Sequence, residues 1–266
     1  MTRRILFAAL LLFPAVLPAA AEEIVDLELV LAIDASSSVD DAEWDLQMHG
    51  YAAAFREPRV QAAIRSGPTK RIAVAVLVWA DSGVPTWGGS WFVLATPDDS
   101  ERFAAFMETL ERGAEGGTGI GAGVSMAIRK LDRNGLAAPR QVVDVLGDGR
   151  ETPAREVVVL MPMARAMAAA RGVTINGIVV ENEDPGLADW YRNNVISGPG
   201  SFVVSAADYA DFAEAILRKL IREIEWQEKL SSRQLPKRLS SRFGQRPRPG
   251  LTRTRIRKER RSKHHR

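Results

Sequence analysis

The sequence LELVLAIDASSS at residues 27–38 places an apolar run of strand length directly before an aspartate and three serines. An apolar run of this length, here residues 27–33, is typical of a central strand that is covered on both faces of a sheet. In the turn that follows, alternate positions point the same way, so the side chains of Asp34, Ser36 and Ser38 are expected to converge. One carboxylate and two hydroxyls form a hard-oxygen donor set that suits Mg²⁺ or Mn²⁺. Alone, the pattern also fits an ordinary turn or helix cap.

The same alternation of short apolar runs and longer amphipathic stretches continues along the chain. Further strands are predicted at residues 71–79, 141–146 and 173–180, with an edge strand or half of a hairpin at 91–96. Helices are predicted at residues 41–56, 100–110, 121–131, 153–170 and 207–228. This order predicts an α/β fold with a doubly wound, mostly parallel central sheet, helices on both faces and one short antiparallel edge strand. Ligands of such sheets bind beyond the carboxyl ends of the strands, where Asp34 lies.

Two later loops carry further oxygen donors. The sequence GGTGIG at residues 116–121 precedes a predicted helix, and its glycines permit a tight loop from which Thr118 projects its hydroxyl. Its spacing matches neither a dinucleotide-binding fingerprint nor a phosphate-binding P-loop. The strand at 141–146 is followed by Gly147-Asp148-Gly149, which puts a second carboxylate at the carboxyl end of a strand. Each loop by itself is also common as a simple turn.

Together, the three loops resemble the metal-ion-dependent adhesion site of von Willebrand factor type A domains in order, spacing and strand context. The resemblance covers about residues 26–228. The chain is still more similar to an exported bacterial subgroup of such domains that is described as a domain of unknown function. Segments shared with this subgroup lie at residues 50–56, 142–145, 175–177, 197–204 and from 211 onward.

The resemblance implies a set of metal ligands, namely Asp34, Ser36, Ser38, Thr118 and Asp148. The two serines would bind through their hydroxyls and Thr118 directly in the ligand-bound state, whereas the two aspartates would act mainly through coordinated water. Such weak direct ligands leave the cation, Mg²⁺ or alternatively Mn²⁺, under-neutralised. A protein partner would then complete the coordination with an Asp or Glu carboxylate. The predicted function is a cation-dependent adhesion or scaffold module.

Two residues of the predicted strand at 141–146 and of the loop after it stand out. Gly147 occupies the position where the commoner domains have a hydroxyl residue, but this removes no expected ligand. Asp144 falls inside the apolar strand, where an ionised carboxylate needs a partner. We expect it to accept a structural hydrogen bond or to pair with Arg71 or Arg140.

No catalytic residues are predicted. A strand that ends in Asp34 resembles the nucleophile strand of haloacid-dehalogenase-type phosphatases, but Ser36 stands where those enzymes need a second aspartate. No Gly-x-Ser-x-Gly elbow is present, and the chain has no cysteine. His49 is the only histidine outside the C-terminal tail and falls in a predicted helix, which favours a surface or packing role. A metal-dependent, phosphatase-like hydrolase is therefore the less favoured alternative to a binding module.

The charge is divided unevenly along the chain. Residues 22–228 carry 19 basic and 32 acidic residues, a net charge of −13, and are expected to form the folded domain. Residues 229–266 carry 15 basic residues and one acid, Glu259, a net charge of +14. This basic tail has almost no apolar periodicity and is expected to be disordered. It offers a second hypothesis, in which the tail holds the protein to an anionic envelope polymer or lipid and the domain is passive.

The N-terminus predicts export. Residues 1–21 combine Arg3 and Arg4, an apolar run at 5–16 and three small residues at 19–21, which is the order of a signal peptide cleaved after Ala21. Pro14 and Pro18 interrupt a run that is already shorter than the ~20 residues of a transmembrane anchor. The mature protein is thus expected in the periplasm or outside the cell. Export, and the lack of an aromatic ladder among the tail arginines, argue against a nucleic-acid partner.

Overall fold

The computed structural model describes residues 21–81, 87–152 and 159–227. The strands in these residues are β1 (Glu23–Ile24), β2 (Glu28–Asp34), β3 (Ile72–Trp79), β4 (Trp87–Gly88), β5 (Phe92–Leu94), β6 (Leu136–Ala137), β7 (Gln141–Gly147), β8 (Thr174–Val180) and β9 (Val203–Ala206). The helices are α1 (Asp41–Arg56), α2 (Pro58–Ile64), α3 (Pro97–Glu108), α4 (Ile120–Lys130), α5 (Met161–Arg171), α6 (Leu187–Asn194) and α7 (Phe212–Ile224).

The main sheet has the order β4-β3-β2-β7-β8-β9, and β5 also pairs with β3. The pairs β3–β2, β2–β7, β7–β8 and β8–β9 are parallel, whereas β4 and β5 run antiparallel to β3. β2 lies between β3 and β7, with Asp34 opposite Trp79 and Ile33 opposite Leu146. This register brings the carboxyl ends of β2 and β7 to the same edge. The predicted α/β fold with a mostly parallel sheet is confirmed, with two short antiparallel strands in place of one.

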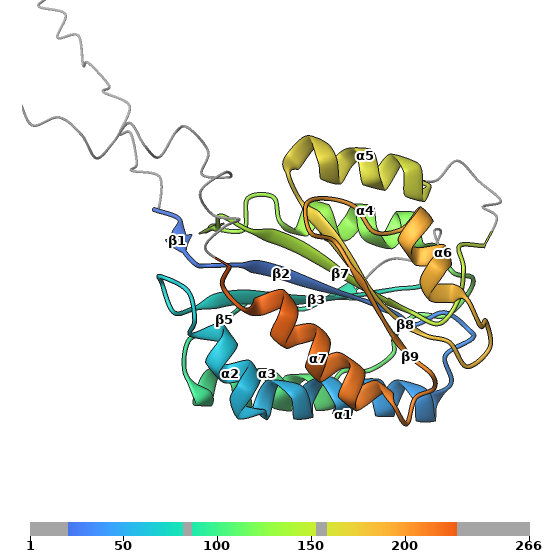
Figure 1. The fold of residues 1–266 in the computed structure, drawn as a ribbon, viewed down its shortest axis with the longest axis horizontal. Coiled ribbons are helices and arrows are strands. Elements are labelled where there is room, and N and C mark those ends of the chain that lie inside the picture. The colour runs from blue at the N-terminus through green and yellow to red at the C-terminus, as the bar shows by residue number, and fades with distance from the viewer. Residues whose placement is uncertain (1–20, 82–86, 153–158, 228–266) are drawn as a thin grey trace, which may run out of the picture.

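Helices cover both faces of the sheet, as Figure 1 shows: α1, α2, α3 and α7 lie on one face and α4, α5 and α6 on the other. The side chains of β2 alternate between the two resulting cores, because successive residues of a strand point to opposite faces. Leu31 and Ile33 pack with α1 and α7, whereas Val30 and Ala32 pack with α4 and α5. The strand is therefore buried along its full length, which explains the apolar residues from Leu29 to Ile33.

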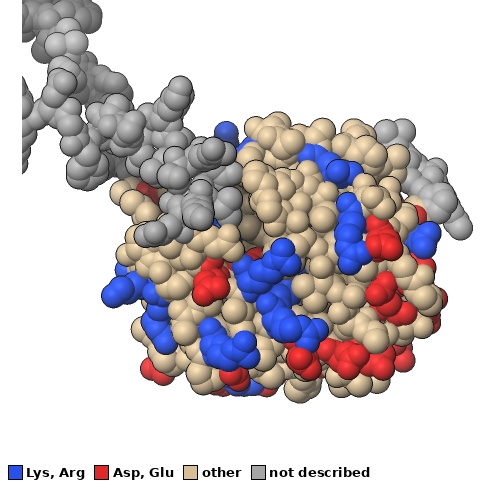
Figure 2. All heavy atoms as spheres, viewed as in Figure 1, with Lys and Arg blue, Asp and Glu red and all other residues tan. Residues whose placement is uncertain are grey.

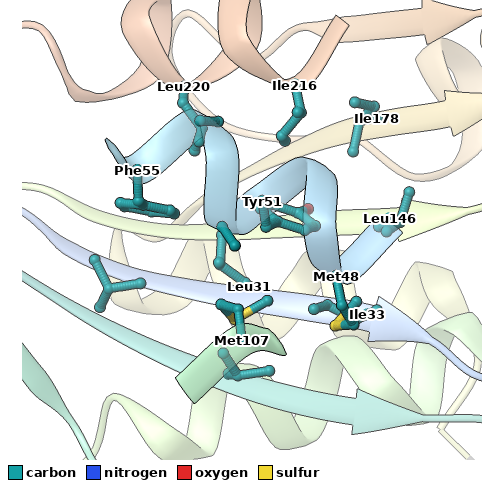
Figure 3. Packing of buried hydrophobic residues seen from close by; sticks show 14 of the residues in the cluster. Leu31, Ile33, Met48, Tyr51, Phe55, Met107, Leu146, Ile178, Ile216 and Leu220 are labelled. Atoms are coloured by element: carbon teal, nitrogen blue, oxygen red, sulfur yellow. The ribbon is translucent and has the colours of Figure 1, made fainter. Parts of the chain in front are cut away.

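α1 begins directly after the serine loop and is held there by its N-cap. The side chain of Asp40 accepts a hydrogen bond from the Glu43 backbone N–H at 2.8 Å, and the Asp40 backbone N–H donates to the Glu43 carboxylate at 3.0 Å. Met48, Tyr51 and Phe55 share one helical face and fill the core between α1, the sheet and α7, as Figure 3 shows. The start and the orientation of α1 thus position the loop at residues 35–40.

Several predicted element boundaries are wrong or incomplete. α5 begins at Met161 rather than at residue 153, and residues 153–158 lie outside the described residues. α7 spans Phe212–Ile224 rather than 207–228, because residues 207–211 form the loop that follows β9. Two helices and four strands were not predicted, namely α2, α6, β1, β4, β6 and β9.

The predicted signal peptide at 1–21 and the basic tail at 229–266 lie outside the described residues, apart from Ala21. Within the described part of the chain, no helix has both the length and the hydropathy needed to cross a bilayer.

Candidate metal site

The predicted ligands of the first and third loops meet at the carboxyl ends of β2 and β7. The Asp34 Oδ1 atom accepts a hydrogen bond from the Ser36 backbone N–H at 2.8 Å, which turns the chain immediately after β2. The hydroxyls of Ser36 and Ser38 lie 3.1 Å apart, and the Ser38 hydroxyl donates to the Asp148 Oδ1 atom at 2.7 Å. Asp34, Ser36 and Asp148 are buried, whereas Ser38 is exposed. The arrangement is therefore a polar cluster that opens to solvent on one side.

The glycine-rich loop brings Thr118 to the same edge of the sheet. Ser37 links the two loops, since its N–H donates to the Gly116 carbonyl at 2.9 Å and its hydroxyl accepts from the Gly116 N–H at 3.1 Å. Gly116 has a φ of 127°, a conformation that residues with side chains rarely adopt. The Thr118 hydroxyl lies 3.7 Å from the position that a Cβ atom on Gly149 would occupy. Thr118 is thus beside the loop that carries Asp148.

The two aspartates of the cluster have strongly perturbed electrostatic environments. The Asp34 side chain is fully buried, and its Oδ2 atom has no hydrogen-bond partner among the residues that the structure describes. Burial, and secondarily the negative charge of Asp148, raise the pKa of Asp34 to about 8. Burial also raises the pKa of Asp148, although hydrogen bonds from Ser38 and Tyr209 oppose this shift. Two neighbouring buried carboxylates need a proton or a cation to compensate their charge.

The donor chemistry fits a divalent cation. Carboxylates and hydroxyls are hard oxygen ligands of the kind that Mg²⁺ and Mn²⁺ prefer. A Cβ atom on Gly147 would lie 2.3 Å from the Tyr191 hydroxyl and 3.3 Å from Asp34 Oδ2, so the absence of a side chain keeps the space beside this oxygen open. In the described ranges, no group of three or more His, Cys, Asp or Glu side chains could hold a metal. The candidate site therefore depends on serine and threonine hydroxyls.

Two residues that support the cluster were not predicted from the sequence. The Tyr209 hydroxyl, from the loop before α7, donates to the Asp148 Oδ2 atom at 3.3 Å. It accepts in turn from the Gln47 side-chain amide of α1 at 3.3 Å. Neither residue belongs to a motif, and the spacing of each from the predicted ligands along the sequence does not indicate a shared site. Only the packing of α1 and α7 on the same face of the sheet brings them to Asp148.

The expected pairing of Asp144 with Arg71 or Arg140 is wrong. Asp144 of β7 is fully buried and pairs with Lys219 of α7 at 2.5 Å. Lys219 also contacts Glu223 at 3.0 Å, and Glu223 accepts a hydrogen bond from the Asn176 side chain at 2.6 Å. Arg71 instead pairs with Glu23, because it precedes β3 at the exposed amino end of the sheet. The Asp144 network ties α7 to the sheet and does not contribute donors to the candidate metal site.

His49 lies on the exposed side of α1, where its Nδ1 atom is 2.7 Å from the Asp45 carbonyl. This agrees with the predicted surface role. It is the only histidine in the described residues, so the predicted ligand cluster contains no imidazole base.

Comparison with solved structures identifies the class of fold as that of von Willebrand factor type A-like domains. The family model described as "Protein of unknown function (DUF1194)" matches residues 24–228, and the chain belongs to this family. The open conformation of the pilus adhesin SpaC from Lactobacillus rhamnosus GG is 12% identical, with a TM-score of 0.52. A second form of SpaC is 11% identical, with a TM-score of 0.53.

Each SpaC match covers 77% of this chain but only 31% of the adhesin, so the likeness concerns the fold alone. Proximal thread matrix protein 1 from the mussel byssus, with a zinc-occupied MIDAS motif, matches 76% of this chain and 48% of its own. Its identity is 14% and its TM-score is 0.47, a likeness too loose to bear on the metal of this chain. No curated protein sequence matches the chain.

Proposed function

We propose that this protein is an exported, divalent-cation-dependent protein-binding module that acts in adhesion or as a scaffold. The observation that carries the proposal is the fully buried Asp34 Oδ2 atom without a hydrogen-bond partner among the described residues, next to a second carboxylate and the serine hydroxyls. A buried, charged oxygen that is left unpaired is costly unless the site is completed by a ligand. Mg²⁺, or alternatively Mn²⁺, is the ligand whose chemistry matches these donors.

Each residue of the proposed site has a distinct task. Ser36, Ser38 and Thr118 would supply neutral hydroxyl oxygens, and Asp34 and Asp148 would supply the negative charge. Tyr209 and Gln47 hold Asp148 in place through their hydrogen bonds. Ser38 is exposed, so an incoming carboxylate from a protein partner would reach the cation from this side. Such a carboxylate supplies the charge that the neutral hydroxyls lack.

The proposal assigns binding rather than catalysis to the site. The cluster offers carboxylates and hydroxyls but contains neither a histidine nor a lysine among its described residues that could act as a base for a nucleophile. The proposed location, the periplasm or the cell exterior, rests on the sequence of residues 1–21.

Calorimetric titration tests the proposed site. Mg²⁺ and Mn²⁺ are titrated into the chain from residue 22 to residue 266 and into a double variant, Asp34→Ala with Ser38→Ala. Ser90→Ala is the matched control, because it removes an exposed hydroxyl from a loop that holds no proposed ligand. We expect binding by the parent chain and by Ser90→Ala, and none by the double variant. Equal heats from the parent chain and the double variant would refute the metal site.

The charge of the tail supports a second candidate function, in which residues 229–266 hold the protein to an anionic envelope polymer or lipid. Salt and chelator distinguish the two functions. Association through the tail weakens steeply as ionic strength rises, whereas association through the metal is lost on addition of a chelator. Cosedimentation with anionic vesicles at low and high salt, with and without EDTA, provides the comparison.

A further inference from the structure

Acidic side chains dominate the end of the domain that carries the candidate metal site. The described parts of the loops at this end are residues 35–40, 80–81, 109–119, 148–152, 181–186 and 207–211. They contain eleven aspartates and glutamates but only two arginines and no lysine. Figure 2 shows Asp and Glu gathered at the lower right, where α1 and α7 begin in Figure 1. The site therefore opens into a strongly negative surface.

Six carboxylates surround the candidate site on this surface, and we call them the acidic rim: Asp40, Asp41, Glu43, Glu115, Glu183 and Asp208. Two of these residues interact with the site. Burial is the main cause of the raised pKa of Asp148, and the charge of Glu183 adds to it; burial is also the main cause of the raised pKa of Glu43, and the charge of Asp148 adds to that shift. Both arginines of the loops are already paired. Arg112 lies 3.3 Å from Asp41 and 3.2 Å from Glu115, and Arg150 lies 2.6 Å from Asp184.

This surface restricts what can deliver a carboxylate to the cation. An isolated acidic group would be repelled by the rim before it reached Ser38. A carboxylate that is flanked by positive charges would instead be attracted, because its neighbours would pair with the rim. The unpaired Asp34 Oδ2 atom marks the ligand position that such a group would complete.

The chain itself contains a segment with this chemistry. Residues 255–261 read Arg-Ile-Arg-Lys-Glu-Arg-Arg, and Glu259 is the only acidic residue in 229–266. We infer that Glu259 of the tail docks on the acidic rim of its own domain and supplies the carboxylate that completes the metal site. The inference rests on the proposed function, because it requires the metal.

The length of the tail allows this docking. α7 ends at Ile224 at the amino end of the sheet, where the Arg140 side chain donates to backbone carbonyls at the end of this helix. The 32 residues from 227 to 259 span up to ~100 Å when extended, whereas the seven residues of β2 span ~23 Å. The tail can thus pass along the domain to the opposite end. Tethering holds Glu259 at an effective concentration near the millimolar range, which favours the chain's own segment over a separate copy.

Paramagnetic broadening of amide NMR signals by Mn²⁺ tests the inference on the chain from residue 22 to residue 266. We expect Mn²⁺ to broaden the amides of residues 34–38, 118 and 148 and also those around residue 259. In Glu259→Gln the site amides still broaden but the tail amides do not, and the Mn²⁺ dissociation constant rises about fivefold, a typical coupling between sites. Glu225→Gln, which removes an exposed glutamate before the tail, behaves like the parent chain.

The outcomes separate this inference from the proposed function. Broadening at the site without any at residue 259 overturns the docking of the tail and leaves the metal site intact. No broadening at the site in the parent chain overturns the proposed function as well. Broadening around residue 259 that disappears on tenfold dilution, while the site stays broadened, assigns Glu259 to a second copy and overturns docking within one chain.

Discussion

At the scale of the residue, Asp34 combines two requirements that usually conflict. It is the last residue of β2, whose residues are all buried, and it places an ionisable carboxyl group where burial disfavours a negative charge. One of its oxygens is used by the Ser36 N–H, which fixes the turn, and the other remains unpaired among the described residues. The fold therefore specifies the position of this carboxyl group, while its charge has to be neutralised by a proton or compensated by a cation.

The space beside Asp34 depends on Gly147. In Gly147→Ala, the new Cβ would lie 2.3 Å from the Tyr191 hydroxyl, so Tyr191 or the end of β7 has to move. We expect a loss of about 1–3 kcal/mol in the free energy of unfolding, as for other overpacked interiors, and weaker Mg²⁺ binding. Urea denaturation and calorimetric titration measure the two effects.

Two further variants test whether the contact with the Tyr191 hydroxyl causes these losses. Gly149→Ala is the control, because its Cβ would meet the Thr118 hydroxyl at an ordinary 3.7 Å. Adding Tyr191→Phe to Gly147→Ala removes the clashing oxygen and should recover part of the lost stability. A Gly147→Ala chain as stable as the parent would show that the contact is not tight.

Lys219 compensates two buried carboxylates at once. In Lys219→Met, Asp144 and Glu223 stay buried without their cation, so we expect a loss of about 3–5 kcal/mol in the free energy of unfolding. Arg218→Met is the matched control, because the Arg218–Glu214 pair is exposed and should contribute less than about 1 kcal/mol. Similar urea midpoints for the two variants would contradict a stabilising role of the buried network.

The same network predicts a pH dependence. Asp144 faces Lys219 and Glu223 of α7 and lies near the Tyr51 hydroxyl of α1. Burial, followed by the charge of Glu223, raises the pKa of Asp144 from 3.8 to about 7. The folded state therefore binds this proton more tightly than the unfolded state. The resulting stability is present below about pH 4 and is lost as the pH rises to about 7. Asp144→Asn should show a smaller decrease in the free energy of unfolding between pH 5 and pH 7; an unchanged slope would assign the titration to another group.

At the scale of the element, periodicity predicted the long elements and missed the short ones. β2, β3, β7 and β8 are predominantly apolar, and their positions differ from the prediction by one residue at most. α1 ends at the predicted residue, but α2, which follows after the single residue Glu57, has only seven residues and is too short for its periodicity to indicate a second helix. β9 has four residues and a half-buried sequence, and only its pairing with β8 defines it as a strand. Tertiary contacts determine these elements.

In the candidate site, too, the sequence predicted one part and missed another. Its three loops were predicted because each directly follows a strand or precedes a helix, and the topology of a parallel sheet brings such loops together. The partners of Asp148 and Asp144 were not predicted. Tyr209 and Lys219 lie 61 and 75 residues away from them along the chain, and their contacts depend on how α7 packs over the sheet. No local pattern records that packing.

The capping box of α1 stabilises the element that holds the serine loop. In Asp40→Ala, the Glu43 N–H loses its acceptor, and we expect a loss of about 1 kcal/mol in the free energy of unfolding. Asp98→Ala in α3 is the control, since Asp98 is also an exposed acid of a first turn but is not a capping residue. Thermal denaturation of both variants checks this. Equal melting temperatures would contradict a stabilising cap.

At the scale of the whole molecule, cation binding should stabilise the fold. A ligand that binds only the folded state at 100 times its dissociation constant adds about 2.7 kcal/mol to the free energy of unfolding. For a domain of this size, we expect saturating Mg²⁺ to raise the melting temperature by about 5–10 °C. EDTA should reverse the rise, and the double variant Ser36→Ala, Ser38→Ala should not show it. A rise of the same size in this variant would indicate binding elsewhere.

The two ends of the described domain are anchored close together in the fold. Glu23 of β1 pairs with Arg71, and the Trp226 N–H donates to the Ser66 hydroxyl, so both ends attach to the short connection between α2 and β3. A domain whose N- and C-terminal ends are adjacent can be inserted into a surface loop of another protein without distorting that loop. The domain therefore has the geometry of a unit that can be inserted into a larger protein, with the carboxyl ends of its parallel strands facing away from the points of attachment.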